Sequence, residues 1–186
     1  MAWPEQIPKT IALQLAIAVA YALAYRVQSA MPLLAGTETA SIIFIPALIR
    51  VAATALSGSL AVVGLFAGSL LVAVQSPIYE ANALWFAFIS AASAPLAYAL
   101  FVQLGLLNRQ PLREADPTMV ILFIASYAVI NAGLHILSWG VLHGGIASHF
   151  PFFIIMVVGD LVPPIAGFAA FRAIRWAFRL AGAHRH

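Results

Sequence analysis

The sequence predicts an all-α membrane protein, a bundle of six transmembrane helices with both termini in the cytoplasm. The class follows from composition, because 63% of the 186 residues are hydrophobic and only 8% are charged. Six acidic and nine basic side chains cannot cover the surface of a water-soluble domain of this length. The apolar stretches are continuous, so the backbone must satisfy its own hydrogen bonds as helices within lipid. The whole chain, 1–186, then forms a single transmembrane domain.

Six apolar stretches define the predicted helices, since roughly 17 to 25 residues are needed to cross about 30 Å of hydrocarbon. The second stretch is short for a span and has Pro46 near its start, so it either begins in the preceding segment or packs as a partial span. Ser57, Gly58 and Ser59 predict a tight turn that makes the second and third helices an antiparallel hairpin. The predicted helices are 8–25, 45–56, 60–75, 83–104, 118–141 and 150–178.

The distribution of basic residues predicts the orientation. With six spans, Arg26 is the one basic residue on the side opposite the termini, and Arg50 lies inside a helix. The positive-inside rule therefore places both termini in the cytoplasm, as in a bacterial inner membrane protein. The basic residues on the side of the termini are Lys9, Arg109, Arg113, Arg172, Arg175, Arg179 and Arg185.

Two further patterns concern the ends of the helices. An aromatic belt would have Trp85 and Trp139 at the outer interface and Trp3 and Trp176 at the inner one. The first helix also fits a signal peptide, because Lys9 precedes an apolar run that ends in small residues. A cleaved chain would keep five spans.

Charged residues inside the predicted spans are the strongest candidates for a site, because each costs a few kcal/mol unless it is paired or faces water. Asp160 lies about ten residues into the last helix, roughly 15 Å from its start and near the bilayer midplane. Arg50 lies a few residues into the second helix. The pair is either a structural tie between helices or a ligand or proton site.

Two polar residues of the fifth helix share a face with one another. Asn131 and His135 are four residues apart and lie between mid-membrane and the outer half. Together with Arg50 and Asp160 they are the predicted polar centre for ligand binding, which Gln14 of the first helix could join. The alternative is that each residue only forms hydrogen bonds between helices.

Glycine and proline patterns predict packing and bends. Gly64 and Gly68 form a GxxxG pair that permits close helix approach. Pro95, and the pair Pro163 and Pro164 just beyond Asp160, are expected to bend or break their helices. The carbonyls freed by such a bend either line a cavity, as in transporters, or accompany an ordinary kink.

Several chemistries are not expected. The chain has no cysteine, and His143 and His149 complete no usual zinc site, so no metal or other cofactor is predicted. Asp160 has no second membrane aspartate for an aspartyl dyad, and Ser57 and Ser59 have no histidine at their depth. We therefore expect no enzymatic activity. Nucleic acid is not an expected partner, because the excess of basic over acidic residues is explained by the positive charge expected on the cytoplasmic side of the membrane.

Arg172, Arg175 and Arg179 are spaced by three and four residues, which places them on one helical face where the last helix leaves the membrane. Such a face suits contact with anionic lipid headgroups. It also suits docking of a cytoplasmic partner protein.

Two patches of the chain resemble a family of bacterial integral membrane sensor domains, the first of the membrane-associated sensor families (MASE-one). One patch comprises Pro46-Ala47, Gly58 and Phe66-Ala67-Gly68 at matching intervals; the other is Val158-Gly159-Asp160-Leu161 before the final apolar stretch. Arg50 stands where the family is typically apolar. The resemblance implies a sensory or accessory subunit that binds a small ligand or another membrane protein in its helical core and acts through a partner protein.

Two other functional classes fit the same chain. Substrate-binding subunits of energy-coupling-factor transporters are six-helix proteins of similar length, and Ala12, Ala16 and Ala20 resemble their docking face. The third class is a structural subunit of a larger membrane complex. A pocket that is accessible from the outer side of the membrane would favour the transporter class. A signalling protein that co-purifies with the chain would favour the sensor class.

Overall fold

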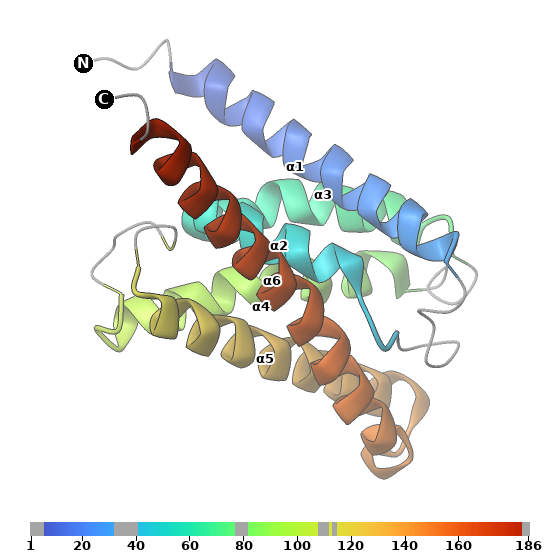
Figure 1. Ribbon diagram of the computed structural model, residues 1–186. Coiled ribbons are helices and arrows are strands. Elements are labelled where there is room, and N and C mark those ends of the chain that lie inside the picture. The colour runs from blue at the N-terminus through green and yellow to red at the C-terminus, as the bar shows by residue number, and fades with distance from the viewer. Residues whose placement is uncertain (1–5, 32–40, 77–81, 108–111, 113–114, 184–186) are drawn as a thin grey trace.

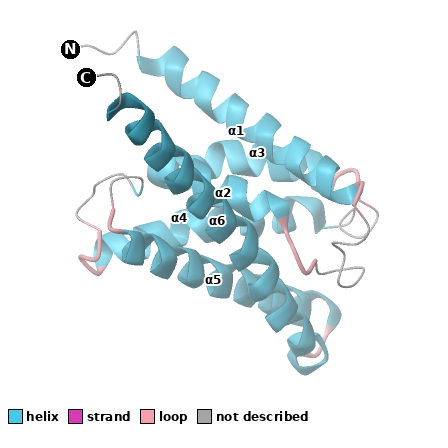
Figure 2. Ribbon diagram, viewed as in Figure 1, coloured by secondary structure: helices cyan, strands magenta, loops and turns pink. Residues whose placement is uncertain are grey.

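The computed structural model describes residues 6–31, 41–76, 82–107, 112 and 115–183. In this part of the chain the regular structure is helical and no strand occurs (Figure 2). The predicted all-α class is therefore confirmed. The helices are α1 (Gln6–Ser29), α2 (Ile45–Ser57), the 3-10 helix η2 (Gly58–Leu60), α3 (Ala61–Ala73), α4 (Ala83–Gln103), α5 (Pro117–His143) and α6 (Ile146–Ala183).

Five stretches of the described chain are long and apolar enough to cross a membrane, not the six expected. The difference arises at α2 and α3, which together count as one stretch, Ile45–Ala73. Each of these helices has 13 residues and is about 20 Å long at 1.5 Å per residue, less than the ~30 Å of hydrocarbon. The turn residues between them divide one continuous apolar run, which is why the sequence predicts two separate spans there.

The predicted hairpin of α2 and α3 is present. Gly58 ends α2 with φ of +58°, a conformation that glycine adopts without a steric penalty, and its N–H donates to the carbonyl of Thr54. Contacts with α1 show that α2 runs antiparallel to α1 and that α3 runs parallel to it, so the chain reverses at the turn. The pairs that establish these directions are Gln28 with Ile45, Tyr21 with Arg50, Gln14 with Gly64, and Arg26 with Gln75.

The remaining helices continue this alternation. Each of the helices α3, α4 and α5 is antiparallel to the helix that follows it, because residues near the end of one helix lie beside residues near the start of the next. As a result, the start of α1 and the end of α6 lie at the same end of the bundle (Figure 1). The pairs that show this are Ala73 with Ala83, Gly58 with Tyr98, Phe101 with Phe123, Phe86 with Trp139, Gly140 with Ile146, and Asn131 with Asp160.

The glycine pair of α3 packs directly against α1, as predicted. A Cβ atom at Gly64 would lie 2.6 Å from the carbonyl oxygen of Gln14, and one at Gly68 would lie 2.7 Å from that of Ala18. No side chain fits at these distances, so the two glycines let the backbones of α1 and α3 approach closely.

Of the bend or break expected at the prolines of the last helix, a break does not occur. Helix α6 runs for 38 residues through both Pro163 and Pro164. A proline cannot donate to the carbonyl four residues earlier, so Pro163 leaves the carbonyl of Gly159 without its helical partner. That carbonyl accepts the N–H of Phe44 at 3.0 Å. The proline thus creates an attachment point for the segment that leads into α2. Pro95 likewise lies within an unbroken α4.

Three other boundaries and positions are corrected. Helix α1 continues past Tyr25 to Ser29, and α6 begins at Ile146, so only Gly144 and Gly145 separate α5 from α6. Both of these glycines have positive φ angles, which permit the abrupt reversal. Trp139 is 5% exposed and packs inside the bundle near Phe86, so it is not part of an interfacial belt.

Candidate functional site

The start of α2 is held in place from two sides. The side-chain oxygen of Gln28 in α1 accepts the N–H of Ile45 at 2.7 Å, which supplies the partner that the first helical N–H lacks. The amide nitrogen of the same Gln28 donates to Ser41 at 2.7 Å. With the bond from Phe44 to Gly159 on α6, these contacts fix the position of α2 and of Arg50 five residues along it.

Arg50 is the largest side chain that is fully buried, with 2% of its surface exposed. Its guanidinium donates to the hydroxyls of Tyr127 at 3.1 Å and Tyr21 at 2.9 Å, and also to Ser90. It lies 5.0 Å from the ring centre of Phe44, within the range of a cation–π contact. The positive charge is therefore surrounded by oxygen acceptors and aromatic rings from several helices.

Asp160 lies opposite Arg50 and is equally buried. One carboxylate oxygen is 3.9 Å from the guanidinium and accepts the Tyr127 hydroxyl at 3.3 Å, and the other accepts the side-chain amide of Asn131 at 2.6 Å. Tyr127 thus bridges the acid and the base. Because the groups around the carboxylate are donors, the surroundings match its ionised form.

These residues form a polar centre to which five of the six α-helices contribute. Tyr21 comes from α1, Arg50 from α2, Ser90 from α4, Tyr127 and Asn131 from α5, and Asp160 from α6. The predicted association of Arg50, Asn131 and Asp160 is observed. A buried pair of this kind is costly to break, because removal of one partner leaves the other charge without compensation.

Two atoms of the centre have no hydrogen-bond partner among the described residues. They are Nε of Arg50 and the side-chain oxygen of Asn131, and both are inaccessible to solvent. Buried polar atoms are usually satisfied, so each is a place where a water molecule or a polar ligand would gain a hydrogen bond. One atom is a donor and the other is an acceptor.

Two other predicted members do not join this network. His135 is buried, but its Nδ1 pairs with the backbone carbonyl of Asn131 at 3.0 Å, and its ring lies near Phe86 and Trp139. It extends the polar face of α5, and its hydrogen bond goes to the backbone of α5 rather than to Arg50 or Asp160. Gln14 lies elsewhere, with its side-chain oxygen accepting the N–H of Gly64 at 3.0 Å.

Three hydroxyl-bearing members of the centre were not among the sequence candidates. Tyr127 could have been found, because it precedes Asn131 by four residues and His135 by eight, so all three share one face of α5. Tyr21 and Ser90 have no such signal. Tyrosine and serine occur throughout membrane helices, and only the packing of α1 and α4 against α2 directs them to Arg50.

The arginine face of α6 lies apart from this centre. Arg172, Arg175 and Arg179 are exposed, and the first two have their guanidinium groups 5.9 Å and 5.7 Å from the ring centres of Phe168 and Phe171. Every side chain from 169 to 179 is exposed. The last turns of α6 therefore extend away from the packed part of the bundle (Figure 1).

The expectation that the protein holds no metal or cofactor stays a prediction. Within the described ranges no three His, Asp, Glu or Cys side chains lie together as a metal site requires. The side chains of His143 and His149 are outside what the structure describes.

Comparisons of the chain with protein-family models, with curated proteins and with solved structures gave no match. What can be concluded about function therefore comes from the geometry and from the residues themselves.

Proposed function

We propose that this protein is a sensory or accessory subunit of a bacterial inner membrane that acts through a partner protein. The observation that carries the proposal is the construction of α6. This single helix contributes Asp160 to the buried polar centre and, about three to five turns later, presents Arg172, Arg175 and Arg179 on its exposed extension. A change at the centre that shifts α6 is transmitted along one continuous helix to the surface that a partner can bind.

The polar centre has the properties of the receiving end. Its charges tie five helices, so altering one contact requires the helices to be repositioned. A small polar ligand, or a polar side chain of a membrane partner, would gain hydrogen bonds at Arg50 Nε and at the oxygen of Asn131. Binding there would shift the equilibrium between two helix arrangements only if it favoured one of them, as any such switch requires.

The exposed extension has the properties of the output end. Three guanidiniums on one face attract an acidic surface, and Phe171 and Phe178 on the neighbouring face are 52% and 75% exposed. The resemblance to MASE-one sensor domains, which precede kinase and cyclase domains, supports a cytoplasmic signalling protein as the partner. No catalytic role is proposed for the chain.

We assign both termini to the cytoplasm on the positive-inside rule. The helix directions bring Lys9 and the arginine face of α6 to one end of the bundle, where positive charge is concentrated. The extension of α6 would then project into the compartment that contains signalling enzymes.

Affinity purification from the native membrane in mild detergent tests the proposal. Mass spectrometry of co-eluting proteins and small molecules would compare the wild type with the triple variant Arg172→Gln, Arg175→Gln, Arg179→Gln. We expect the amount of partner that co-elutes with the triple variant to be about tenfold lower than with the wild type, or lower still. The matched control Lys9→Gln, Arg109→Gln, Arg113→Gln removes the same charge from the same predicted side and is expected to retain it.

The variant Asp160→Asn tests the receiving end in the same experiment. If the centre receives a signal, the variant changes the ligand content or the amount of bound partner. If only thermal stability falls and the co-eluting material is unchanged, the centre is structural, and the protein belongs with structural subunits. A co-eluting transport ATPase that is retained by all variants would instead support the transporter class.

A further inference from the structure

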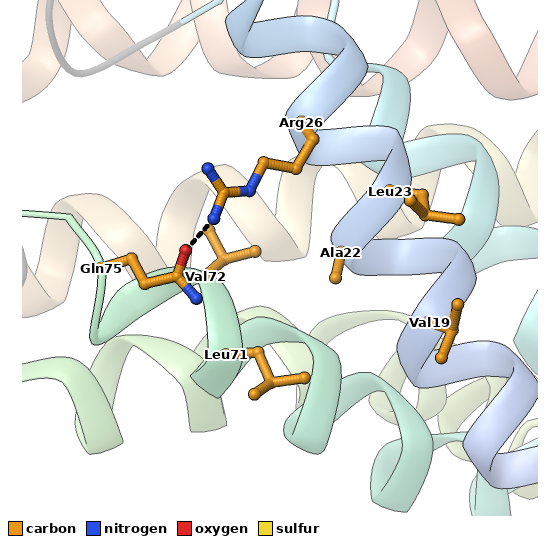
Figure 3. Close-up of a pocket in the computed structure, with 7 residues that line it drawn as sticks. All are labelled: Val19, Ala22, Leu23, Arg26, Leu71, Val72 and Gln75. Atoms are coloured by element: carbon orange, nitrogen blue, oxygen red, sulfur yellow. Dashed lines mark hydrogen bonds between the residues drawn. The ribbon is translucent and has the colours of Figure 1, made fainter.

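A groove lies between α1 and α3 (Figure 3). It has a volume of about 270 Å³, equivalent to about nine water molecules at ~30 Å³ each. Apolar side chains make up most of its wall, and the two polar groups lie together at one end. The lining residues are Val19, Ala22, Leu23, Arg26, Leu71, Val72 and Gln75.

The apolar part of this groove is open toward the space around the bundle. Val19, Leu23 and Leu71 are 56%, 60% and 50% exposed, and they belong to stretches apolar enough to span a membrane. Ala22 contributes only a methyl group, which leaves the hollow between the larger side chains (Figure 3). Because lipid chains surround such stretches, an occupant reaches this groove laterally from the bilayer.

The polar end of the groove carries a positive charge without an acidic partner among the described residues. The guanidinium of Arg26 donates to the side-chain oxygen of Gln75, which holds it over the end of the groove (Figure 3). A neutral amide satisfies one of its five N–H donors and does not offset its charge. The amide nitrogen of Gln75 supplies a further donor at the same place.

We infer that this groove binds an acidic phospholipid, with the phosphate at Arg26 and Gln75 and an acyl chain along Val19, Ala22 and Leu71. The guanidinium matches a phosphate in charge and in the spacing of its donors, and the apolar wall matches the chain. A net negative headgroup is favoured over a zwitterionic one because Arg26 brings a positive charge that has no acidic partner among the described residues. The inference does not rest on the function proposed above, since the hydrogen bond between Arg26 and Gln75 involves neither Arg50 nor Asp160.

Native mass spectrometry of the detergent-solubilised protein tests this inference. The probes are phosphatidylglycerol and phosphatidylcholine with identical acyl chains. One arginine near a membrane surface contributes about 1 kcal/mol toward an anionic lipid, so we expect the first phosphatidylglycerol to bind about fivefold more tightly than the first phosphatidylcholine. Arg26→Gln is expected to abolish that preference.

Two controls locate the effect. Lys9→Gln removes the same charge from the other end of α1 and is expected to leave the preference unchanged. Ala22→Leu fills the groove and is expected to weaken binding of both lipids, whereas Ala16→Leu adds the same atoms to an exposed position of α1 outside the groove and is expected to have no effect. Ala22→Leu also keeps the inference testable if Arg26→Gln does not fold.

Three results would overturn the inference. They are equal binding of the two lipids by the wild type, a preference that survives in Arg26→Gln, and equal losses in Ala22→Leu and Ala16→Leu. Equal binding would mean that the groove holds ordinary surrounding lipid without selection by charge.

Discussion

At the scale of single residues, the arrangement at Arg50 and Asp160 predicts an asymmetry between single and double substitutions. Asp160→Asn leaves the guanidinium of Arg50 buried without a counter-charge, and we expect it to lower the free energy of unfolding by about 3 kcal/mol. Arg50→Met costs less, because a buried carboxyl without its counter-charge can take up a proton and become neutral, whereas a guanidinium stays charged. Combining both substitutions should restore stability to within about 1 kcal/mol of the wild type.

Reversible unfolding in mixed micelles measures these differences. Thr54→Val is the matched control, since Thr54 is equally buried on α2 but its hydroxyl bonds only to the backbone carbonyl of Arg50. That change is expected to cost less than about 1 kcal/mol. Additive losses in the double variant would show that Arg50 and Asp160 do not act as a pair.

The residues of the centre also show what a sequence can reveal at this scale. Arg50, Asn131 and Asp160 stand out because charged and amide groups are rare and costly in apolar helices. Tyr21 and Ser90 do not stand out, because only the packing of other helices brings them to Arg50. They are 29 and 40 residues away from Arg50 in the sequence. The cost of burying a charge can be predicted from the residue and its own helix, whereas the partners of that charge depend on how the helices pack.

At the scale of helices, the close packing of α1 on α3 predicts a sharp difference between glycines. Gly68→Ala would bring a methyl group to 2.7 Å from the carbonyl oxygen of Ala18, so the helices must separate, and we expect a loss of about 2 kcal/mol. Gly133→Ala in α5 is the matched control. No atom lies within 4 Å of its Cβ position, and the higher helix propensity of alanine should stabilise it by up to about 1 kcal/mol.

Thermal melting followed by circular dichroism in detergent compares the two glycine variants. We expect a lower midpoint for Gly68→Ala and an unchanged or higher one for Gly133→Ala. Equal midpoints would mean that α1 and α3 do not depend on close approach at Gly68.

Hydropathy and turn chemistry account for the elements that the sequence predicts well. The GxxxG pair and the turn at Gly58 were predictable because each depends on a few adjacent residues. The continuity of α6 was not, because the loss of a helical hydrogen bond at Pro163 is compensated by the N–H of Phe44, a residue more than a hundred positions earlier. A proline rule applied along one helix cannot include a donor from another segment.

At the scale of the whole molecule, the number of crossings and the orientation are linked. The helix directions bring the start of α1 and the end of α6 to the same end of the bundle, although the described residues contain five stretches apolar enough to span a membrane. The two facts agree if Ile45–Ala73 doubles back, as the reversal at Gly58 indicates. Composition identifies the apolar stretches, but it gives neither the number of spans between Ile45 and Ala73 nor the direction of each helix.

Cysteine labelling determines the sides directly, because the natural chain has no cysteine. We expect Ser29→Cys, at the far end of α1, to react with a membrane-impermeant maleimide in right-side-out spheroplasts. Gln6→Cys and Ala183→Cys are expected to react only in inverted vesicles, because positive charge is concentrated at their end of the bundle. The reverse pattern would place the arginine face of α6 outside the cell and exclude a cytoplasmic signalling partner. Labelling of Gln6→Cys and Ala183→Cys from opposite sides would mean that Ile45–Ala73 crosses the membrane once and that the reversal at Gly58 does not persist in the bilayer.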